Sequence, residues 1–381
     1  MKKRKVCVVT GSRAEYGLFL PIMKKIQASD YLKLSLVATT MHFSEEFGNS
    51  YSQIEKDGFQ IDEKIENLLS GDSKGSIAKS SGLAMILLSD AFSRIKPDIV
   101  LLLGDRFETH AAASTAILMN IPVAHIHGGE ITEGAVDEKM RHSITKMSNI
   151  HFTSTEHYKK RVLKMGENPK SVFFVGAPGI DNIVNMDLLN KKQLEKELNW
   201  KIHGPTALFT YHPETLASTN VLGEIKKILA IVKDSAINVL FTYANADHGG
   251  KIINYEVEKF ASIDKKKYLV VKNLGQLNYL SAMKIVDVVI GNTSSGIIEA
   301  ASFCKPVINI GNRQLGRMQS KNVINSKIEN LGYSIKKSIS KNFVKECNDV
   351  INIYGDGDSS EKIVKELTKI NLTTTKIFFD S

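Results

Sequence analysis

The sequence is poor in cysteine and tryptophan and has no long apolar run. Its 381 residues include three cysteines and one tryptophan. Cys7, Cys304 and Cys347 are odd in number and form no C-x-x-C pair, which argues against a disulfide framework and against a cysteine zinc site. This usage is typical of a reducing compartment, so we expect a cytoplasmic protein. Apolar runs such as Ile99–Leu103 fall far short of the ~20 residues that a membrane helix needs, so we expect no membrane partner.

The sequence does have an excess of basic residues, but they do not cluster. Fifty lysines and arginines against 41 acidic residues give a formal net charge of +9. The lysines are scattered, and the run 265–267 has no interleaved aromatic residues, so we expect no nucleic-acid partner. A basic surface can still attract a small anionic substrate. Hydrophobic residues make up 43% of the chain, which indicates a globular protein, and its length suggests two domains at ~150 residues each.

Apolar runs alternate with segments of helical period along the whole chain, which predicts βαβ units with parallel sheets. The fold class predicted is therefore α/β, with two Rossmann-like doubly wound domains facing a cleft. We place an N-terminal domain at 1–176 and a C-terminal domain at 177–357. A C-terminal helix within 358–381 is expected to pack back on the N-terminal domain. Ligands of such folds bind outside the carboxyl ends of the strands.

Two loops at expected strand ends of the first domain are candidates for binding a phosphate or a sugar. Within residues 11–17, the small residues Gly11 and Ser12 precede Arg13 at an expected helix start, which suits the binding of a phosphate. The alternative is a plain tight turn. The loop does not have the G-x-G-x-x-G pattern of dinucleotide sites. Asp105 and Arg106 follow the buried run 99–103, where a general base or a ribose-binding carboxylate belongs, although aspartate is also a common helix cap.

A histidine-rich segment follows the next expected strand. His125 and His127 stand in an H-x-H pattern, and Glu130 follows a glycine pair. One interpretation is a zinc site, which would need a third protein ligand. Another is acid–base chemistry without a metal, and a third is a structural polar network.

The helix expected over 136–148 begins with two acids. At i,i+4 spacing Asp137 would face Arg141, and Glu138 would face His142. Because the helix starts shortly after Glu130, its acids are expected to reach the same pocket. Paired carboxylates there would raise one pKa and supply both an acid and a base.

Polar and small side chains also follow the expected strands of the second domain. They are His212, Asn245, Thr293, Ser294, Ser295, Glu299 and Arg313. The small residues at 293–295 allow backbone and hydroxyl groups to approach a phosphate. Glu299 stands one turn later, within reach of a ribose, and Arg313 offers a further anion-binding group.

As an ordered set, these motifs resemble one family, the hydrolysing UDP-N-acetylglucosamine 2-epimerases, in particular their bacterial sialic-acid-pathway branch. The resemblance runs from the first strand to about residue 324. The motifs that carry it are GSRAEYG (11–17), GDR (104–106), HIHGGE (125–130), DExxRHxITK (137–146), HPET (212–215), GNTSSG (291–296) and NIGNRQxGR (309–317).

The resemblance implies a fold like glycosyltransferase type B and hydrolysis of UDP-N-acetylglucosamine to UDP and N-acetylmannosamine through a glycal. That product would feed the synthesis of sialic-acid-type sugars for a surface polysaccharide. The resemblance also implies no cofactor and no metal. A homo-oligomer, either a dimer or a tetramer, is expected.

The resemblance further assigns roles to residues. UDP would be bound by Arg13, Arg106, Asn245, Thr293, Ser294, Ser295, Glu299 and Arg313. The residues near the reacting sugar would be Asp105, Glu130, Asp137, His127 and His212. Many relatives carry an acid where this chain has His127, so the catalytic acid is either Glu130 or His127.

Three alternatives stay open at this point. The same hydrolysis could act on a UDP-2,4-diacetamido-2,4,6-trideoxyhexose. A type B glycosyltransferase or a non-catalytic nucleotide-sugar sensor would keep the phosphate loop but would not need the acids around 105–138.

Overall fold

The computed structural model describes residues 3–45, 49–69, 73–132, 136–213, 220–244 and 249–380. The chain forms two compact units. The first contains Met1–Glu130, Val136–Asn182 and Tyr354–Ser381, and the main part of the second is Ile183–Ile353. No helix within the described ranges is long and apolar enough to cross a membrane.

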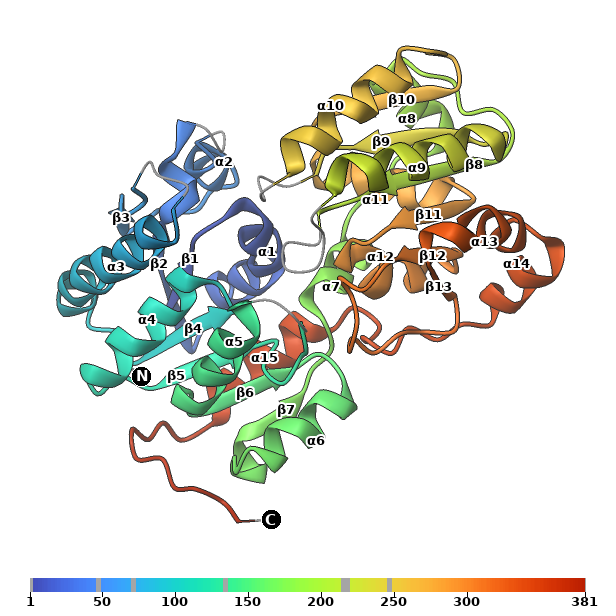
Figure 1. Ribbon diagram of the computed structural model, residues 1–381. Helices are drawn as coiled ribbons and strands as arrows, with labels where there is room; N and C mark the ends of the chain where they lie inside the picture. The colour runs from blue at the N-terminus through green and yellow to red at the C-terminus, as the bar shows by residue number, and fades with distance from the viewer. Residues whose placement is uncertain are drawn as a thin grey trace. The chain divides into compact units, whose positions relative to one another are not determined.

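The first unit is built on a seven-stranded parallel sheet in the order β3-β2-β1-β4-β5-β6-β7 (Figure 1). Its strands are β1 (Arg4–Thr10), β2 (Leu32–Thr39), β3 (Glu63–Ile65), β4 (Ile99–Leu103), β5 (Val123–Ile126), β6 (Ile150–Thr153) and β7 (Val172–Phe174). Its helices are α1 (Arg13–Gln27), α2 (Tyr51–Lys56), α3 (Lys74–Ile95), α4 (Phe107–Leu118), α5 (Val136–Met147), α6 (Glu156–Lys164) and α15 (Ser359–Lys369), together with the start of α7 (Pro178–Asn185).

The second unit repeats this arrangement with a six-stranded parallel sheet in the order β10-β9-β8-β11-β12-β13. Its strands are β8 (Thr206–Thr210), β9 (Asn238–Thr242), β10 (Tyr268–Val271), β11 (Val288–Gly291), β12 (Val307–Ile310) and β13 (Val323–Ser326). Its helices are α8 (Lys191–Leu198), α9 (Val221–Asp234), α10 (Gly250–Ala261), α11 (Gly275–Ile285), α12 (Ser294–Ile298), α13 (Leu331–Ser338) and α14 (Lys341–Asn348).

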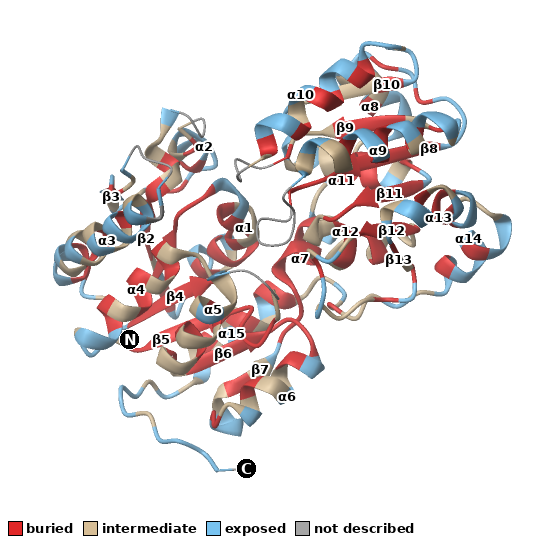
Figure 2. Cartoon of the chain, in the orientation of Figure 1, coloured by how far each residue is buried: buried red, intermediate tan, exposed pale blue. Residues whose placement is uncertain are grey.

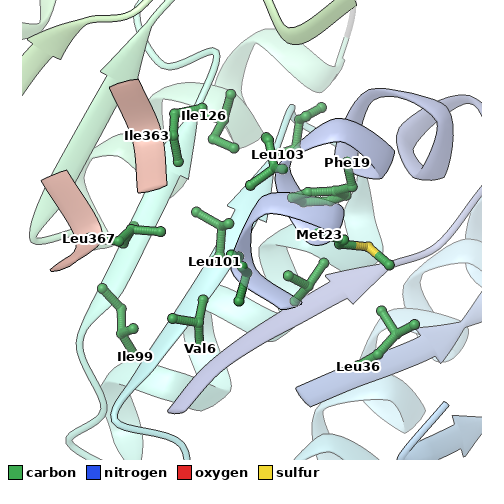
Figure 3. Close-up of a cluster of buried hydrophobic side chains, with 14 of the residues drawn as sticks. Val6, Phe19, Met23, Leu36, Ile99, Leu101, Leu103, Ile126, Ile363 and Leu367 are labelled. Carbon is green, nitrogen blue, oxygen red and sulfur yellow. The ribbon is translucent and has the colours of Figure 1, made fainter. Parts of the chain in front are cut away.

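Helices cover both faces of each sheet, and the central strands are therefore apolar on both sides. All five residues of β4 are buried. Leu101 and Leu103 pack with Phe19 of α1, and Ile363 and Leu367 of α15 lie in the same cluster (Figure 3). The alternate residues of β4 belong to a second cluster, which contains residues of α3, α4 and α5. Figure 2 shows the strands of both sheets as buried and the outer helix faces as largely exposed.

Both strand orders are of the Rossmann type, which confirms the predicted fold class. In each unit the order reverses beside the first strand, between β1 and β4 and between β8 and β11. The carboxyl ends of the strands at such a switch point are the usual place for a ligand. The two switch points therefore locate the candidate site in each unit.

The units divide a few residues away from the predicted positions, between Asn182 and Ile183 and between Ile353 and Tyr354. The reason is Asp181 at the start of α7, whose carboxylate accepts the backbone N–H groups of Ser359 (3.0 Å) and Ser360 (2.7 Å). The sequence analysis singled out no element at the edge strands β3 and β13 or at the helices α2, α7, α11, α13 and α14.

Candidate active site

Asp105 stands at the switch point of the first unit, directly after β4. Gly104 adopts φ +84°, which turns the chain out of the strand. The Asp105 carboxylate accepts a hydrogen bond from Nη2 of Arg141, a residue of α5 that lies 36 positions further along the chain. Asp105 is therefore fixed by a side chain from another element.

Arg141 joins several of the predicted residues. It is 3% exposed, and its Nη1 donates to the carbonyl of His127 (3.2 Å) and lies 3.7 Å from Oε2 of Glu130. The sequence analysis had paired Arg141 with Asp137 on the same helix and missed its long-range contacts. The other predicted pair, Glu138 with His142, does form at 2.9 Å.

His127 and Glu130 face each other across the glycine pair. Nδ1 of His127 lies 3.2 Å from Oε1 of Glu130, which also accepts a hydrogen bond from the Ser154 hydroxyl (2.6 Å). Gly129 has φ +78°, and a Cβ there would lie 2.7 Å from the carbonyl oxygen of Tyr158, so the tight loop needs a glycine at this position. Ser154, at the end of β6, is a further site residue that the sequence analysis did not identify.

His125 has a supporting position. Its Nε2 donates to the Gly104 carbonyl (2.7 Å), and its Nδ1 lies 3.3 Å from the Thr145 hydroxyl. Burial lowers the pKa of His125 to about 3, so the ring is neutral at pH 7. The ring therefore steadies the loop that carries Asp105. Among the residues that the structure describes, no three His, Cys, Asp or Glu side chains come together as metal ligands.

Asp137, at the start of α5, lies within electrostatic range of Asp105. Burial and the Asp105 carboxylate raise the pKa of Asp137, while Arg106 and Arg141 oppose the shift. Two carboxyl groups, one at the end of β4 and one at the start of α5, therefore influence each other. Such a pair can hold one protonated and one ionised carboxyl group.

A second carboxyl pair lies beside the loop after β1. Glu15 accepts the Gly11 N–H (2.7 Å) and the Thr109 hydroxyl (3.2 Å), and burial together with Glu108 raises the pKa of Glu15 to about 8. Nε of Arg106 donates to Glu108 (2.6 Å). Any contact of Arg106 with UDP would be made alongside this ion pair. Arg13 is exposed at the first position of α1.

In the second unit, His212 follows β8 and Asn292 follows β11. The Asn292 side chain accepts the backbone N–H of His212 (2.7 Å) and donates to its carbonyl (2.9 Å). Burial and the nearby Arg313 lower the pKa of His212 to about 3. His212 is therefore a neutral group held at the switch point.

Two residues of the loop after β12, Arg313 and Gln314, contact Asn292. The backbone carbonyl of Asn292 accepts hydrogen bonds from Nη1 of Arg313 (3.1 Å) and from the Gln314 amide (2.9 Å). These two contacts bring the loop after β12 to the end of β11. The sequence analysis identified Arg313 but neither Asn292 nor Gln314.

The small residues after Asn292 begin α12. Thr293 caps this helix by accepting the Ser295 N–H (3.4 Å), and the Ser295 hydroxyl lies 2.6 Å from the hydroxyl of Tyr279. Ser294 and Glu299 are half-buried. Burial of its carboxyl group raises the pKa of Glu299 to about 8, so this group can donate as well as accept a hydrogen bond. The predicted UDP ligand Asn245 lies outside the described residues.

Each unit therefore provides a different kind of chemistry. The first holds acids and histidines at adjoining strand ends, and these groups can accept and donate protons. The second holds a cation, hydroxyl groups and a neutral histidine, a set that suits a diphosphate and a ribose.

Known proteins resemble this chain over almost its full length. Residues 24–368 match the family model described as UDP-N-acetylglucosamine 2-epimerase. The GDP/UDP-N,N'-diacetylbacillosamine 2-epimerase (hydrolyzing) of Campylobacter jejuni is 44% identical, over 98% of both chains. The UDP-N,N'-diacetylbacillosamine 2-epimerase (hydrolyzing) of Legionella pneumophila is 35% identical, over 97% of both. The UDP-N-acetylglucosamine 2-epimerase of Neisseria meningitidis serogroup B is 28% identical, over 99% of both.

A solved structure shows the same fold. The crystal structure of the UDP-GlcNAc 2-epimerase from Neisseria meningitidis, bound to UDP-GlcNAc, superposes with a TM-score of 0.82 at 20% identity and covers 96% of this chain and 100% of that one. The match to the family model and the 44% identity over almost the full length lead to one conclusion. This chain belongs to the UDP-N-acetylglucosamine 2-epimerase family.

Proposed function

We propose that the protein is a hydrolysing 2-epimerase whose substrate is UDP-N,N'-diacetylbacillosamine, a UDP-2,4-diacetamido-2,4,6-trideoxyhexose. The products are UDP and the free sugar inverted at C2. The cluster of His127, Glu130, Arg141 and Asp105 is the observation that carries the reaction type, because it places several proton-transfer groups at neighbouring strand ends.

The choice of sugar depends on the relatives. Two enzymes named for diacetylbacillosamine are 44% and 35% identical to this chain, whereas the Neisseria enzyme named for UDP-N-acetylglucosamine is 28% identical. This difference favours the alternative substrate over the conversion of UDP-N-acetylglucosamine to N-acetylmannosamine. The latter remains the second candidate because the family model carries that name. Either product would enter the synthesis of sialic-acid-type sugars.

The chemistry balances without a redox step. A base removes the proton from C2 while the C1–O bond breaks, so that UDP leaves and a glycal forms. Water then adds its hydroxyl to C1, and a proton returns to C2 on the opposite face. These steps need two acid–base groups and positive charge for the leaving diphosphate, but no nicotinamide.

We assign the proton transfers to the first unit. Asp105 and Asp137 provide the carboxyl groups on one side, and the pair of His127 and Glu130 provides the other. Burial and the Asp105 carboxylate raise the pKa of Asp137, which favours its protonated form relative to an exposed aspartate.

We assign UDP binding to the second unit. Arg313 provides the positive charge for the diphosphate, with Thr293, Ser294 and Ser295 as hydrogen-bond partners and Glu299 at the ribose. The lowered pKa of His212 keeps its ring neutral, so it would bind the diphosphate or the sugar by a hydrogen bond rather than by charge. Arg13 of the first unit is a further candidate for the diphosphate.

The test is turnover of three substrates in D₂O: UDP-N,N'-diacetylbacillosamine, its GDP counterpart and UDP-N-acetylglucosamine. We expect free sugar with deuterium at C2, UDP in equal amount, and a kcat/KM at least about tenfold higher for the diacetamido sugar, which corresponds to ~1.4 kcal/mol. A product still attached to UDP, or one without deuterium, would exclude hydrolytic epimerisation. A preference for UDP-N-acetylglucosamine would establish the second candidate instead.

A further inference from the structure

We infer that His127 is one of the two groups that exchange a proton with C2 of the sugar, and that Glu130 is a positioning residue behind it. This assignment rests on the proposed function, and it separates two residues that the sequence leaves equivalent. It follows from the enclosure of Glu130, the orientation of the His127 ring and the backbone that holds the ring.

The Glu130 carboxylate is enclosed by protein groups. Its side chain is 1% exposed. Oε1 accepts a hydrogen bond from Ser154 (2.6 Å) and lies 3.2 Å from Nδ1 of His127, and Oε2 lies 3.7 Å from Nη1 of Arg141. Both oxygens therefore face side chains of the same unit. A sugar carbon would have to displace one of these neighbours to reach the carboxylate. The His127 side chain is 8% exposed, and Nε2 of its ring is itself buried, so this exposure lies on other atoms of the side chain.

The pairing determines which nitrogen of the His127 ring can act as a base. A carboxylate can only accept a hydrogen bond, so Nδ1 is the nitrogen that carries the proton in the neutral ring. The lone pair then lies on Nε2, at the far side of the ring from Glu130. The carboxylate also stabilises the imidazolium that forms when Nε2 takes up a proton, as in other histidine–carboxylate pairs.

The backbone of His127 holds the ring in place. Its φ of +68° lies in the left-handed region, which is unfavourable for a residue with a Cβ. The N–H donates to the carbonyl of Phe152 (3.0 Å), and the carbonyl accepts from Arg141 (3.2 Å), so both backbone groups are bound. Glycine adopts this conformation without strain, and replacing His127 by glycine should therefore leave the loop intact.

The charged and titratable groups around the ring come from several elements. Glu130 lies on the same loop, Arg141 comes from α5, and Asp105 lies beyond Arg141 at the end of β4. His125 of β5 is neutral at pH 7. Glu130 favours the protonated ring and Arg141 opposes it. Removing the Glu130 charge should thus make His127 harder to protonate.

The first experiment is chemical rescue of His127→Gly with added imidazole. We expect turnover to fall by at least ~10²-fold while UDP binding and circular dichroism stay unchanged. Imidazole should restore at least a tenth of the lost activity, and the deuterium should again appear at C2. His203→Gln, on an exposed loop of the second unit, is the matched control and should behave like the wild type, with no response to imidazole.

The second experiment is the pH profile of Glu130→Gln. A positioning role predicts a variant that keeps measurable turnover, about 10- to 100-fold below the wild type, with the acidic limb of its kcat profile shifted to lower pH. A purely structural role would lower the rate without moving that limb. Ser154→Ala should reduce turnover less and leave the limb in place.

Three results would overturn the assignment. The first is a His127→Gly variant that binds UDP normally but is not rescued by imidazole. The second is a Glu130→Gln variant without activity beside an active His127→Gly variant, which would make Glu130 the proton carrier. The third is a wild type that converts none of the three nucleotide sugars, which would overturn the proposed function itself. The activity of the wild type is measured first. A failure of the proposed function is therefore distinguished from a failure of the His127 assignment.

Discussion

The Asn292 side chain and the His212 backbone form a reciprocal pair of hydrogen bonds across the switch point of the second unit. The amide donates to the His212 carbonyl at 2.9 Å, and the His212 N–H donates to the amide oxygen at 2.7 Å. Because the Asn292 carbonyl also accepts from Arg313, one asparagine connects the ends of β8, β11 and β12.

Replacing Asn292 by alanine should therefore weaken UDP binding and the fold together. The substitution leaves a buried N–H and a buried carbonyl of His212 without this partner, at a cost of about 1–3 kcal/mol. We expect UDP affinity measured by calorimetry to fall at least tenfold. Asn348→Ala, at an exposed position at the end of α14, is the control. Unchanged UDP affinity in Asn292→Ala would argue against UDP binding at this switch point.

Replacement by alanine should destabilise the protein at one glycine and stabilise it at another. Gly291 has φ +139°, and a Cβ there would lie 1.8 Å from the Thr210 carbonyl oxygen, so Gly291→Ala should cost at least ~3 kcal/mol or prevent folding. A Cβ on Gly82, within α3, meets nothing within 4 Å, so Gly82→Ala should stabilise the protein by about 0.5–1 kcal/mol. Urea unfolding measures both. A Gly291→Ala variant as stable as the wild type would contradict this geometry.

Replacing Arg141 by methionine should greatly lower turnover without affecting UDP affinity. The change removes the partner of Asp105 and leaves the buried Glu130 with less positive charge nearby. Breaking a buried ion pair in this way lowers the free energy of unfolding by about 3–5 kcal/mol. We expect kcat to fall at least ~10²-fold, measured by UDP release. Arg94→Gln, which removes an exposed ion pair with Glu63, should behave like the wild type. A comparable loss in both variants would remove Arg141 from the proposed site.

Glu15 should make the protein less stable as the pH rises. Its pKa is about 8 in the folded protein, above the ~4.3 of an unfolded chain, so the folded state binds the extra proton between these values. Stability from this group is complete below about pH 4 and is lost as the pH rises towards 8. Glu15→Gln should therefore show a smaller loss of stability between pH 5 and pH 8 in urea unfolding. An identical pH dependence would show that Glu15 does not titrate in this window.

The amino-acid pattern alone predicted much of the fold. The five apolar residues of β4 have to be buried on both faces, and the alternation of such runs with amphipathic helices leads to parallel sheets. Loops at strand ends are where polar residues can approach a ligand, so the sequence also located most of the candidate groups. The edge strands β3 and β13 mix polar with apolar residues, so neither forms an apolar run that would predict a buried strand.

The partners of the site residues were decided only by the tertiary structure. Arg141 reaches Asp105 rather than being limited to its own helix, and Asn292 meets His212 from 80 residues away. The H-x-H pattern divides into a ring that steadies Gly104 and a ring that pairs with Glu130. Such contacts depend on which strands become neighbours and where a helix lies on the sheet. Local periodicity fixes which residues are buried, but only the packed sheet fixes which buried groups meet.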